Sequence, residues 1–214
     1  MQTLNSPAAE QPDFRIRTAT AADADAVVEL VSLVDLHLRA DEAATALATM
    51  RYALTATDDG PLSHQNNHFL LAETSGGIPV GVVVCGPPYW IARPGRMSGL
   101  VRRRLVHRLS CVHNLAVRPE HRGHGIARAL LRETEAAFRN AGYAALTLRH
   151  DRDLSAFYQR LGYTSATRLS LMLPPLGLIT LTDQGWKHAF KLLSPDASAA
   201  NVQGLPTICG LLPD

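Results

Sequence analysis

The sequence predicts a mixed α/β (α+β) fold in which helices flank a central β-sheet. Two kinds of stretch follow one another along the chain. In one kind, apolar and polar residues alternate, as in strands; in the other, apolar residues recur every three or four positions, as in helices. Their order is β-α-α-β-β followed by β-α-β-α-β. One strand pair is joined by a tight Gly-Gly turn and must be antiparallel, whereas helices separate other strands. The sheet is therefore expected to be mixed and not purely parallel.

The first half of the chain is expected to form one strand, two helices and a hairpin. FRIRTAT, residues 14–20, alternates as a strand does. A helix should follow, because Thr20 suits the N-cap position and acidic residues come directly after it. A second helix should cover about residues 41–57. HFLLAETSGGIPVGVVVCG, residues 68–86, predicts the hairpin, and residues 87–99 are expected to be an unusually long loop.

The second half is expected to alternate strands and helices. CVHNLAV, residues 111–117, indicates a strand, and a helix should run from about residue 125 to 140 before a stop at Gly142. YAALTLRH indicates the next strand, DLSAFYQRLGY a short helix that ends at Gly162, and residues 164–173 a further strand. The helix at 125–140 has an apolar face of Ala127, Leu130, Leu131, Thr134 and Phe138 and an opposite, charged side of Arg128, Arg132, Glu135 and Arg139.

The 214 residues are expected to form one domain with two appendages. Residues 1–13 are polar and should be a flexible tail, and residues 14–175 should form the domain. Residues 176–214 follow a Pro-Pro pair, differ in composition, and should add one strand and a short helix near residues 186–193. The apolar stretches of this extension need cover, either from the same domain or from a second copy of the chain, so a homodimer is one of two expectations.

Composition and charge exclude several kinds of partner. Apolar residues make up 46% and charged residues 19%, which is typical of a globular domain. A net charge of +2 is too small to argue for nucleic acid or an anionic membrane surface. Neither a signal peptide nor an apolar run of about 18 residues is evident, so we expect a cytoplasmic protein without membrane contact. Three cysteines without paired spacing fit a reducing compartment.

VRPEHRGHGIARALL, residues 117–131, places two glycines directly before a predicted helix. The first amides of a helix have no intrahelical partner, and glycines let a phosphate approach them. A P-loop is excluded, because no Gly-Lys pair exists. The dinucleotide fingerprint of an oxidoreductase fits Gly123 and Gly125, but Arg128 stands where the third glycine belongs and the acidic residue about twenty positions on is missing. The glycines could also merely permit a tight turn.

Two separated motifs resemble one known family. HNLAVRPEHRGHGIARALL contains the pattern R-x-x-G-x-A and closely resembles the acetyl-CoA-binding motif of the GNAT superfamily of N-acyltransferases. FYQRLGY, residues 157–163, is similar to that family's F/L-Y-x-x-x-G-F/Y, and the opening FRIRTATAADADAVVEL is similar to its first strand and helix. The resemblance spans residues 14–173. It implies a mostly antiparallel sheet that contains one splayed pair of parallel strands.

The resemblance implies transfer of an acetyl group from acetyl-CoA, a co-substrate that needs no metal, to a primary amine on a small molecule or a peptide. The amides of the pantetheine arm would pair with the open edge of a strand. The pyrophosphate would rest on amides at the helix start, and arginines would steady its charge. The residues implied for binding CoA are Leu115, Ala116, Val117, Arg122, Gly123, His124, Gly125, Ile126, Ala127 and Arg128.

The implied reaction is direct attack of the amine on the thioester. Tyr158 occupies the position of the family's proton donor for the leaving thiolate, although it could also only pack. The general base stays open: His113 titrates in the useful range but could face a core, and His150 with Asp151 is the second candidate. Many members carry an asparagine where this chain has Asp151, so that role is not carried over; Asp151 could orient an amine or cap the helix. A backbone amide within residues 115–117 would serve the oxyanion.

Three further features leave alternatives open. The segment at residues 87–105 could form a lid over the acceptor, or it could pack on the core or on a neighbouring subunit. Its candidate residues are Tyr89, Trp90, Arg93, Arg96 and Met97. His64 and His68 lie in turn sequence without a third ligand, so no metal site is expected. The alternative to an enzyme is a non-catalytic sensor of acyl-CoA on the same scaffold.

Overall fold

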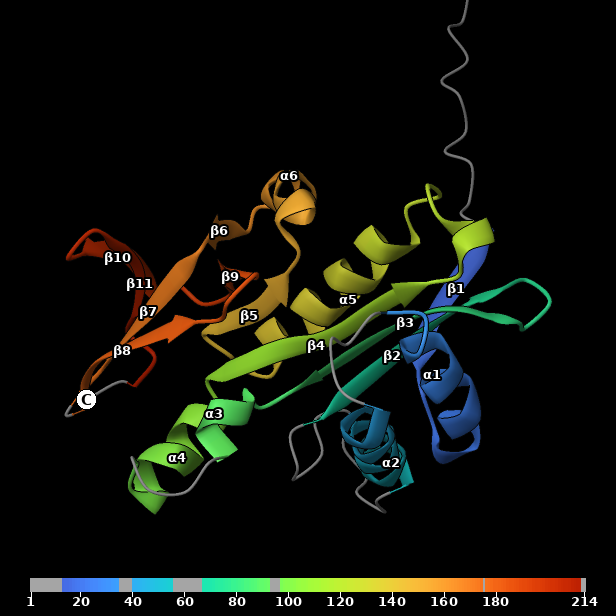
Figure 1. Cartoon of the computed structure of the whole chain (residues 1–214), viewed down its shortest axis with the longest axis horizontal. Coiled ribbons are helices and arrows are strands. Elements are labelled where there is room, and N and C mark those ends of the chain that lie inside the picture. The colour runs from blue at the N-terminus through green and yellow to red at the C-terminus, as the bar shows by residue number, and fades with distance from the viewer. Residues whose placement is uncertain (1–12, 35–39, 56–66, 93–96, 175, 213–214) are drawn as a thin grey trace, which may run out of the picture.

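Seven strands form the central sheet of the molecule, in the order β1-β2-β3-β4-β5-β9-β6 (Figure 1). All neighbours are antiparallel except β4 and β5, which are parallel. The strands are β1 (Phe14–Thr18), β2 (His68–Thr74), β3 (Pro79–Gly86), β4 (Leu109–Val117), β5 (Ala145–His150), β6 (Thr164–Ala166) and β9 (Lys187–Leu192). The computed structural model describes residues 13–34, 40–55, 67–92, 97–174 and 176–212. The expected mixed, mostly antiparallel sheet is confirmed.

Helices cover both faces of this sheet (Figure 1). On β2, Leu70 packs with the helix α5, whereas its neighbour Leu71 packs with Val27 of α1, because successive side chains of a strand point to opposite faces. Separate core clusters therefore lie under α5 on one face and under α1 on the other, and a third cluster contains Ile91 of α3 and Leu105 of α4. The helices are α1 (Ala24–Val31), α2 (Ala40–Thr55), α3 (Tyr89–Ala92), α4 (Gly99–Val106), α5 (Ile126–Asn140) and α6 (Ser155–Arg160). Short 3₁₀ turns are η1 (Ala21–Asp23), η2 (Pro119–His121) and η3 (Arg152–Leu154).

Most local expectations for the first half are confirmed. Thr20 is the N-cap before η1, and its amide donates to the Asp23 carboxylate at 2.7 Å. The Gly-Gly turn joins β2 to β3, with Gly77 at a φ of 79° that only glycine adopts freely. The predicted helix at about 41–57 is α2. The expected tail falls almost wholly outside the described residues, which begin at residue 13.

The expected loop at 87–99 is wrong for residues 89–92 and 99, which are helical, whereas residues 87, 88, 97 and 98 are irregular as expected. Residues 89–92 form the short helix α3, and α4 begins at Gly99. Ser98 is the N-cap of α4, and its side chain accepts a hydrogen bond from the Val101 amide at 3.3 Å. Trp90 and Ile91 of α3, together with Leu105 of α4, pack in the core, which overrides the weak local signal. Arg93 and Arg96 of the proposed lid lie outside the described residues, as does His64.

The helix expected near residues 186–193 is wrong, because this stretch is the strand β9 inside the central sheet. Ala189 packs in the core of one face and Phe190 in the core of the other. A strand that is buried on both faces has no alternation, so its apolar run resembles part of a buried helix. The chain after residue 175, expected to be an extension, thus contributes a strand between β5 and β6.

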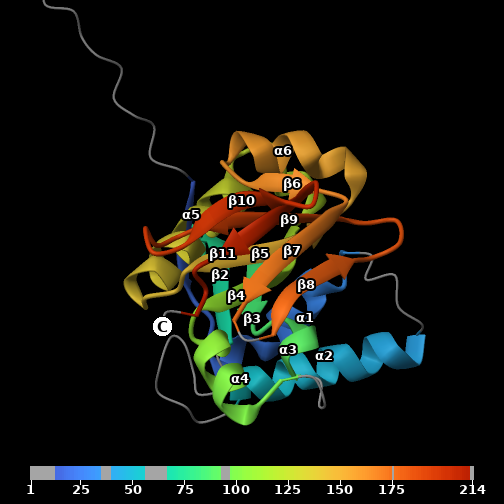
Figure 2. The same cartoon turned by 90° about the vertical axis from the view of Figure 1, so that its left-hand side faces the viewer.

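The strand expected over residues 164–173 divides between two sheets. Residues 164–166 form β6 on β9, whereas β7 (Arg168–Leu173) belongs to a second sheet of four strands in the order β10-β11-β7-β8. Its other strands are β8 (Gly177–Thr182), β10 (Ser198–Val202) and β11 (Leu205–Cys209). Figure 1 shows this sheet at the left-hand end of the central one, and in Figure 2 it faces the viewer. No helix among the described residues is long and apolar enough to cross a membrane.

The expected apolar face of α5 is confirmed, with one correction on its charged side. Leu130, Leu131 and Phe138 are fully buried, but Glu135, expected on the exposed side, is only 5% exposed. Its carboxylate accepts a hydrogen bond from Lys191 Nζ of β9 at 2.6 Å, and the same ammonium donates to the Leu161 carbonyl at 2.7 Å. A partly buried ion pair between α5 and β9 thus joins residues 56 positions apart.

Replacing Lys191 by methionine is expected to lower the free energy of unfolding by about 3 kcal/mol, because the Glu135 carboxylate then stays buried without a cation. Urea unfolding at pH 7 measures this. Lys187→Met, on the same strand but without a recorded ion pair among the described residues, is the control and should cost much less. The double variant Glu135→Leu/Lys191→Met should recover most of the loss. Equal midpoints for Lys191→Met and Lys187→Met would contradict a stabilising pair.

Candidate active site

The two parallel strands at the centre of the sheet separate to form a fork. β4 and β5 pair from Leu109 and Ala145 as far as Val112 and Leu148. Beyond this point β4 stays paired with β3 up to Val117, but its pairing with β5 ends. The splayed parallel pair that the family resemblance implied is therefore present, and one edge of β4 beyond Val112 is open toward the gap.

A β-bulge lies at the start of the fork. Val112 of β4 pairs with Cys85 of β3, but the next pair joins Asn114 to Val84, so that His113 is an extra residue without a partner on β3. A bulge interrupts the alternation of side chains. As a result, His113 and Asn114 line the same cavity although they are consecutive in the chain.

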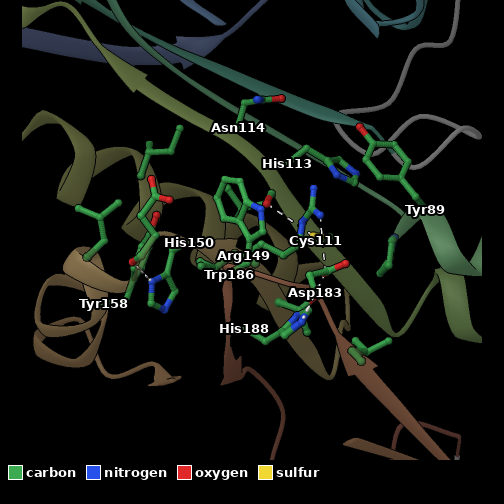
Figure 3. Close-up of a pocket in the computed structure, with 18 of the residues that line it drawn as sticks. Tyr89, Cys111, His113, Asn114, Arg149, His150, Tyr158, Asp183, Trp186 and His188 are labelled. Carbon is green, nitrogen blue, oxygen red and sulfur yellow. Dashed lines mark hydrogen bonds and ion pairs between the residues drawn. The ribbon is translucent and has the colours of Figure 1, made fainter. Parts of the chain in front are cut away.

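The fork opens into a cavity of about 480 Å³, shown in Figure 3. At one end lie Tyr158 and His150, and toward the other end lie Tyr89, Asp183 and His188. The walls come from segments far apart in sequence: α3, β4, β5, η3, α6, β8 and β9 all contribute. The cavity-lining residues that sequence reasoning missed include Cys111, Asn114, Thr147, Arg149, Asp183, Trp186 and His188.

Tyr158 lines the cavity from the helix α6 and is 6% exposed. Its ring packs edge-on against Phe157 and Tyr163 and lies 4.9 Å, centre to centre, from the ring of His150. Burial, with a smaller effect of the nearby Asp151 carboxylate, raises the pKa of Tyr158 to about 12. The phenol is therefore protonated at neutral pH and can donate a proton or a hydrogen bond into the cavity.

His113 is held at the bulge by neighbours on both sides. Its ring stacks on Tyr89 with centres 4.3 Å apart. Burial lowers the pKa of His113 to about 4, and the charge of Arg149 also lowers it, although a hydrogen bond to the Pro87 backbone opposes both effects. The imidazole is therefore neutral at pH 7. It can accept a proton, but only weakly.

The free energy of unfolding is expected to rise between pH 4 and about pH 6.5 because of His113. In this window the folded protein leaves the imidazole neutral, whereas the unfolded chain protonates it at its ordinary pKa of 6.5. The stabilisation is complete above pH 6.5 and is lost as the pH falls toward 4. Urea unfolding across this range should show a shallower rise for His113→Gln than for the parent. His107→Gln, an exposed site, is the control; parallel curves for the parent and His113→Gln would contradict the expected linkage.

The second candidate base, His150, uses both of its ring nitrogens. Nδ1 lies 2.7 Å from the Asp151 carbonyl oxygen, which can only accept, and Nε2 lies 2.8 Å from Ser165 Oγ. Nδ1 therefore carries the proton, and Nε2 accepts from the hydroxyl. Asp151 directly precedes η3, but its side chain makes no capping hydrogen bond, and it lines the cavity. Of the two alternatives for Asp151, the structure favours a carboxylate that faces the site.

The glycine-rich turn connects the end of β4 to the start of α5. Gly123 and Gly125 have φ values of 84° and 81°, in the left-handed region, and Gly125 is the N-cap of the helix. A Cβ added at either glycine would meet no atom within 4 Å. The space around them is open, so close packing does not require glycine here. The glycines instead allow the left-handed backbone conformation and leave the first amides of the helix accessible.

The other predicted CoA-binding residues divide into several environments. Leu115 lines the cavity, whereas Ala116, Val117 and Ile126 are buried, so only their backbone groups can face a ligand. Arg122 donates from Nε to the Val117 carbonyl at 3.0 Å and so ties the turn to the end of β4. His124 is exposed and Ala127 half-buried. Arg128 lines a second, smaller pocket of about 180 Å³ between α5 and α6, together with Arg132 and Arg160.

Solved structures of N-acetyltransferases share the fold of this chain. The chain is similar to a GNAT family N-acetyltransferase (YhbS) from Escherichia coli in complex with CoA, at 20% identity over 96% of this chain and 93% of that chain, TM-score 0.57. It is also similar to the PaiA N-acetyltransferase from Thermoplasma acidophilum with coenzyme A (14%, 84% and 98%, TM-score 0.54). A third is yncA from Salmonella typhimurium with its cofactor acetyl-CoA (19%, 87% and 97%, TM-score 0.55).

These identities are low and establish the shared fold. A family model described as an acetyltransferase (GNAT) domain matches residues 65–165, which include the fork, the glycine turn and Tyr158. Residues 65–165 are therefore similar to the GNAT acetyltransferase domain, in agreement with the resemblance seen in the sequence motifs. No curated protein matches the sequence. Among the described residues, no group of three or more histidine, cysteine or acidic side chains is arranged to hold a metal ion.

Proposed function

We propose that this protein transfers an acetyl group from acetyl-CoA to a primary amine by direct attack of the amine on the thioester. One observation carries the proposal: the open edge of β4 leads from a cavity lined by Tyr158 to a glycine turn at the start of α5. The strand β4 would thus connect the cavity, where the reaction would occur, with the glycine turn, where the pyrophosphate would bind. The solved relatives that contain CoA or acetyl-CoA support the choice of co-substrate.

CoA would lie along this path. The pantetheine amides would hydrogen-bond the open edge of residues 113–117, as an added strand does. The pyrophosphate would accept hydrogen bonds from amides of the turn and the first turn of α5, where the helix dipole favours negative charge. Arg122 and Arg128 would supply full positive charges nearby. Arg132 and Arg160, which share a pocket with Arg128, would extend this basic surface.

The reaction requires three catalytic roles from the protein: stabilising the oxyanion, protonating the leaving thiolate and accepting a proton from the amine. Backbone amides at the open edge of β4 would stabilise the oxyanion that forms on the thioester carbonyl. Tyr158 would donate its proton to the departing thiolate as the carbon–sulfur bond breaks, since its raised pKa keeps it protonated. The attacking amine must lose a proton, and His113 remains our candidate acceptor. Because its pKa is about 4, His113 would orient the amine and pass the proton on to water more effectively than it would keep it.

Thiol release from acetyl-CoA across a panel of primary amines tests this proposal. The expected result is release that depends on both the amine and the protein, with N-acetylated amine as product. The opposing outcome is tight CoA binding without turnover of any amine, which would favour an acyl-CoA sensor over an enzyme. Failure of both binding and turnover in well-folded protein would overturn the proposal altogether.

A further inference from the structure

The far half of the cavity holds a cation that the proposed chemistry does not use. The last pair between β4 and β5 is Val112 with Leu148. The next residue on β5 is Arg149, and the next residue on β4 is His113. Both line the cavity, and Figure 3 shows the Arg149 side chain between His113 and Trp186. The guanidinium thus lies at the fork, beside the place where a bound thioester would meet its acceptor.

The contacts of Arg149 orient its guanidinium and leave donors unused. Its Cζ lies 5.4 Å from the centre of the Trp186 ring, so that the group is held over an aromatic surface. Its ion-pair partner among the described residues is Asp183, at 3.6 Å from Nη1 to Oδ2, which is longer than a hydrogen bond. The Arg149 side chain is 49% exposed. Within the part of the chain that the structure describes, Nε and Nη2 make no hydrogen bond or ion pair, so this edge of the guanidinium can form a two-point contact with a ligand.

The surroundings of Arg149 select for an anion on an otherwise apolar body. The imidazoles of His113 and His188 have pKa values lowered by burial and are neutral at pH 7. Tyr89, Trp90 and Trp186 add aromatic surface. Among the described residues that line the cavity, Arg149 is the single arginine or lysine. The carboxylates among the described lining residues are Asp151 and Asp183, and Asp183 already lies near Arg149. An acceptor with several ammonium groups would therefore have Asp151 as its one carboxylate not already near a cation.

We propose that Arg149 binds a carboxylate of the acceptor, which makes the acceptor an amino acid or a closely related amino carboxylate with an apolar or aromatic side chain. This inference rests on the proposed acetyltransfer and names its substrate class. An amino acid carries its amine within one carbon of the carboxylate carbon. Anchoring the carboxylate on Arg149, at the fork, would therefore place the amine beside the thioester. The rings of Trp186 and Tyr89 would contact the side chain.

Matched pairs of acceptors test the proposal. Phenylalanine and phenethylamine differ by the carboxylate alone, and the phosphonate analogue of phenylalanine replaces one anion by another. We expect the parent protein to use phenylalanine with a kcat/KM about 10- to 100-fold above that of phenethylamine, the range expected for a charge-assisted two-point contact. Lower activity with the phosphonate than with the carboxylate would identify the planar anion as the preferred one, whereas the reverse order would overturn the carboxylate assignment.

Variants separate binding of the anion from general damage. Arg149→Gln should lose the preference for phenylalanine, so that the ratio of the kcat/KM values for phenylalanine and phenethylamine falls about 10- to 100-fold. Arg149→Lys should keep part of this ratio because a point charge lacks the two-point geometry. Arg139→Gln, at an exposed position of α5, is the matched control. Equal losses on both acceptors would show a structural role for Arg149 and overturn the proposal, as would a parent protein that prefers phenethylamine.

A binding measurement keeps this proposal distinct from the proposed reaction. If no amine is turned over, quenching of tryptophan fluorescence in CoA-loaded protein still reports whether phenylalanine binds, because Trp186 lines the site. Binding of phenylalanine that Arg149→Gln abolishes would support the anion site even though acetyltransfer had failed. Absence of binding by both phenylalanine and its phosphonate would overturn it.

Discussion

Replacing Tyr158 by phenylalanine is expected to lower kcat at least about 100-fold while leaving the affinity for CoA unchanged. The substitution removes one hydroxyl and keeps the ring that packs against Phe157 and Tyr163. The leaving thiolate then departs without a proton donor, so the loss appears in the chemical step and not in binding. Initial rates at saturating acetyl-CoA, together with calorimetry of CoA binding, measure the two effects separately.

Tyr163→Phe is the matched control for this substitution. Tyr163 is equally buried and touches the same core, but it does not line the cavity, so the loss of its hydroxyl should leave kcat within about twofold of the parent. The parent should also keep its activity up to at least about pH 10, since the pKa of Tyr158 is about 12. Equal activity of the parent and Tyr158→Phe would show that the leaving thiolate needs no help from this phenol.

Replacing Gly125 by alanine is expected to raise the dissociation constant for CoA about tenfold or more. Alanine is strained at a φ of 81°, and relief of this strain rotates the amides that face the pyrophosphate. A shift that costs about 1.4 kcal/mol of binding energy corresponds to a factor of ten. The added methyl group meets no protein atom within 4 Å, so the fold itself should tolerate it. Calorimetric titration with CoA measures the change.

Gly142 provides a control at the other end of the same helix. It has a φ of 82° and equally open surroundings, so Gly142→Ala carries the same backbone strain far from the proposed phosphate site. Both variants should lose similar stability, roughly 1 kcal/mol, but only Gly125→Ala should lose affinity for CoA. An unchanged dissociation constant in Gly125→Ala would mean that the turn shapes the chain and does not hold a phosphate.

The elements that could be predicted are those whose signal is local. The β2–β3 hairpin has a Gly-Gly turn between alternating segments, and α5 has a complete apolar stripe and a glycine at each end, so neighbouring residues suffice to define them. β9 could not be predicted in this way. It lies between β5 and β6 and is buried on both faces, and its place in the sheet depends on partners 22 to 47 positions earlier in the chain, from Ala166↔His188 to Ala145↔Leu192.

The same distinction holds for the site. Tyr158 and the glycine turn lie in short motifs that can be recognised from a dozen residues. The positions of Arg149 and His188 in the site could not be predicted locally, because they depend on the register between β5 and β9, which sets the two residues directly opposite each other. The bulge that turns His113 into the cavity depends on β3 and has no signal within β4 itself. The acceptor half of the cavity was therefore the part that the sequence could not reveal.

Isothermal titration of the intact chain with coenzyme A tests the central claim most directly, namely that the fork and the glycine turn form a site for this molecule. We expect a single saturable transition with one CoA bound per chain. The absence of measurable binding at millimolar CoA, in protein that unfolds cooperatively and is therefore folded at the start, would contradict the claim.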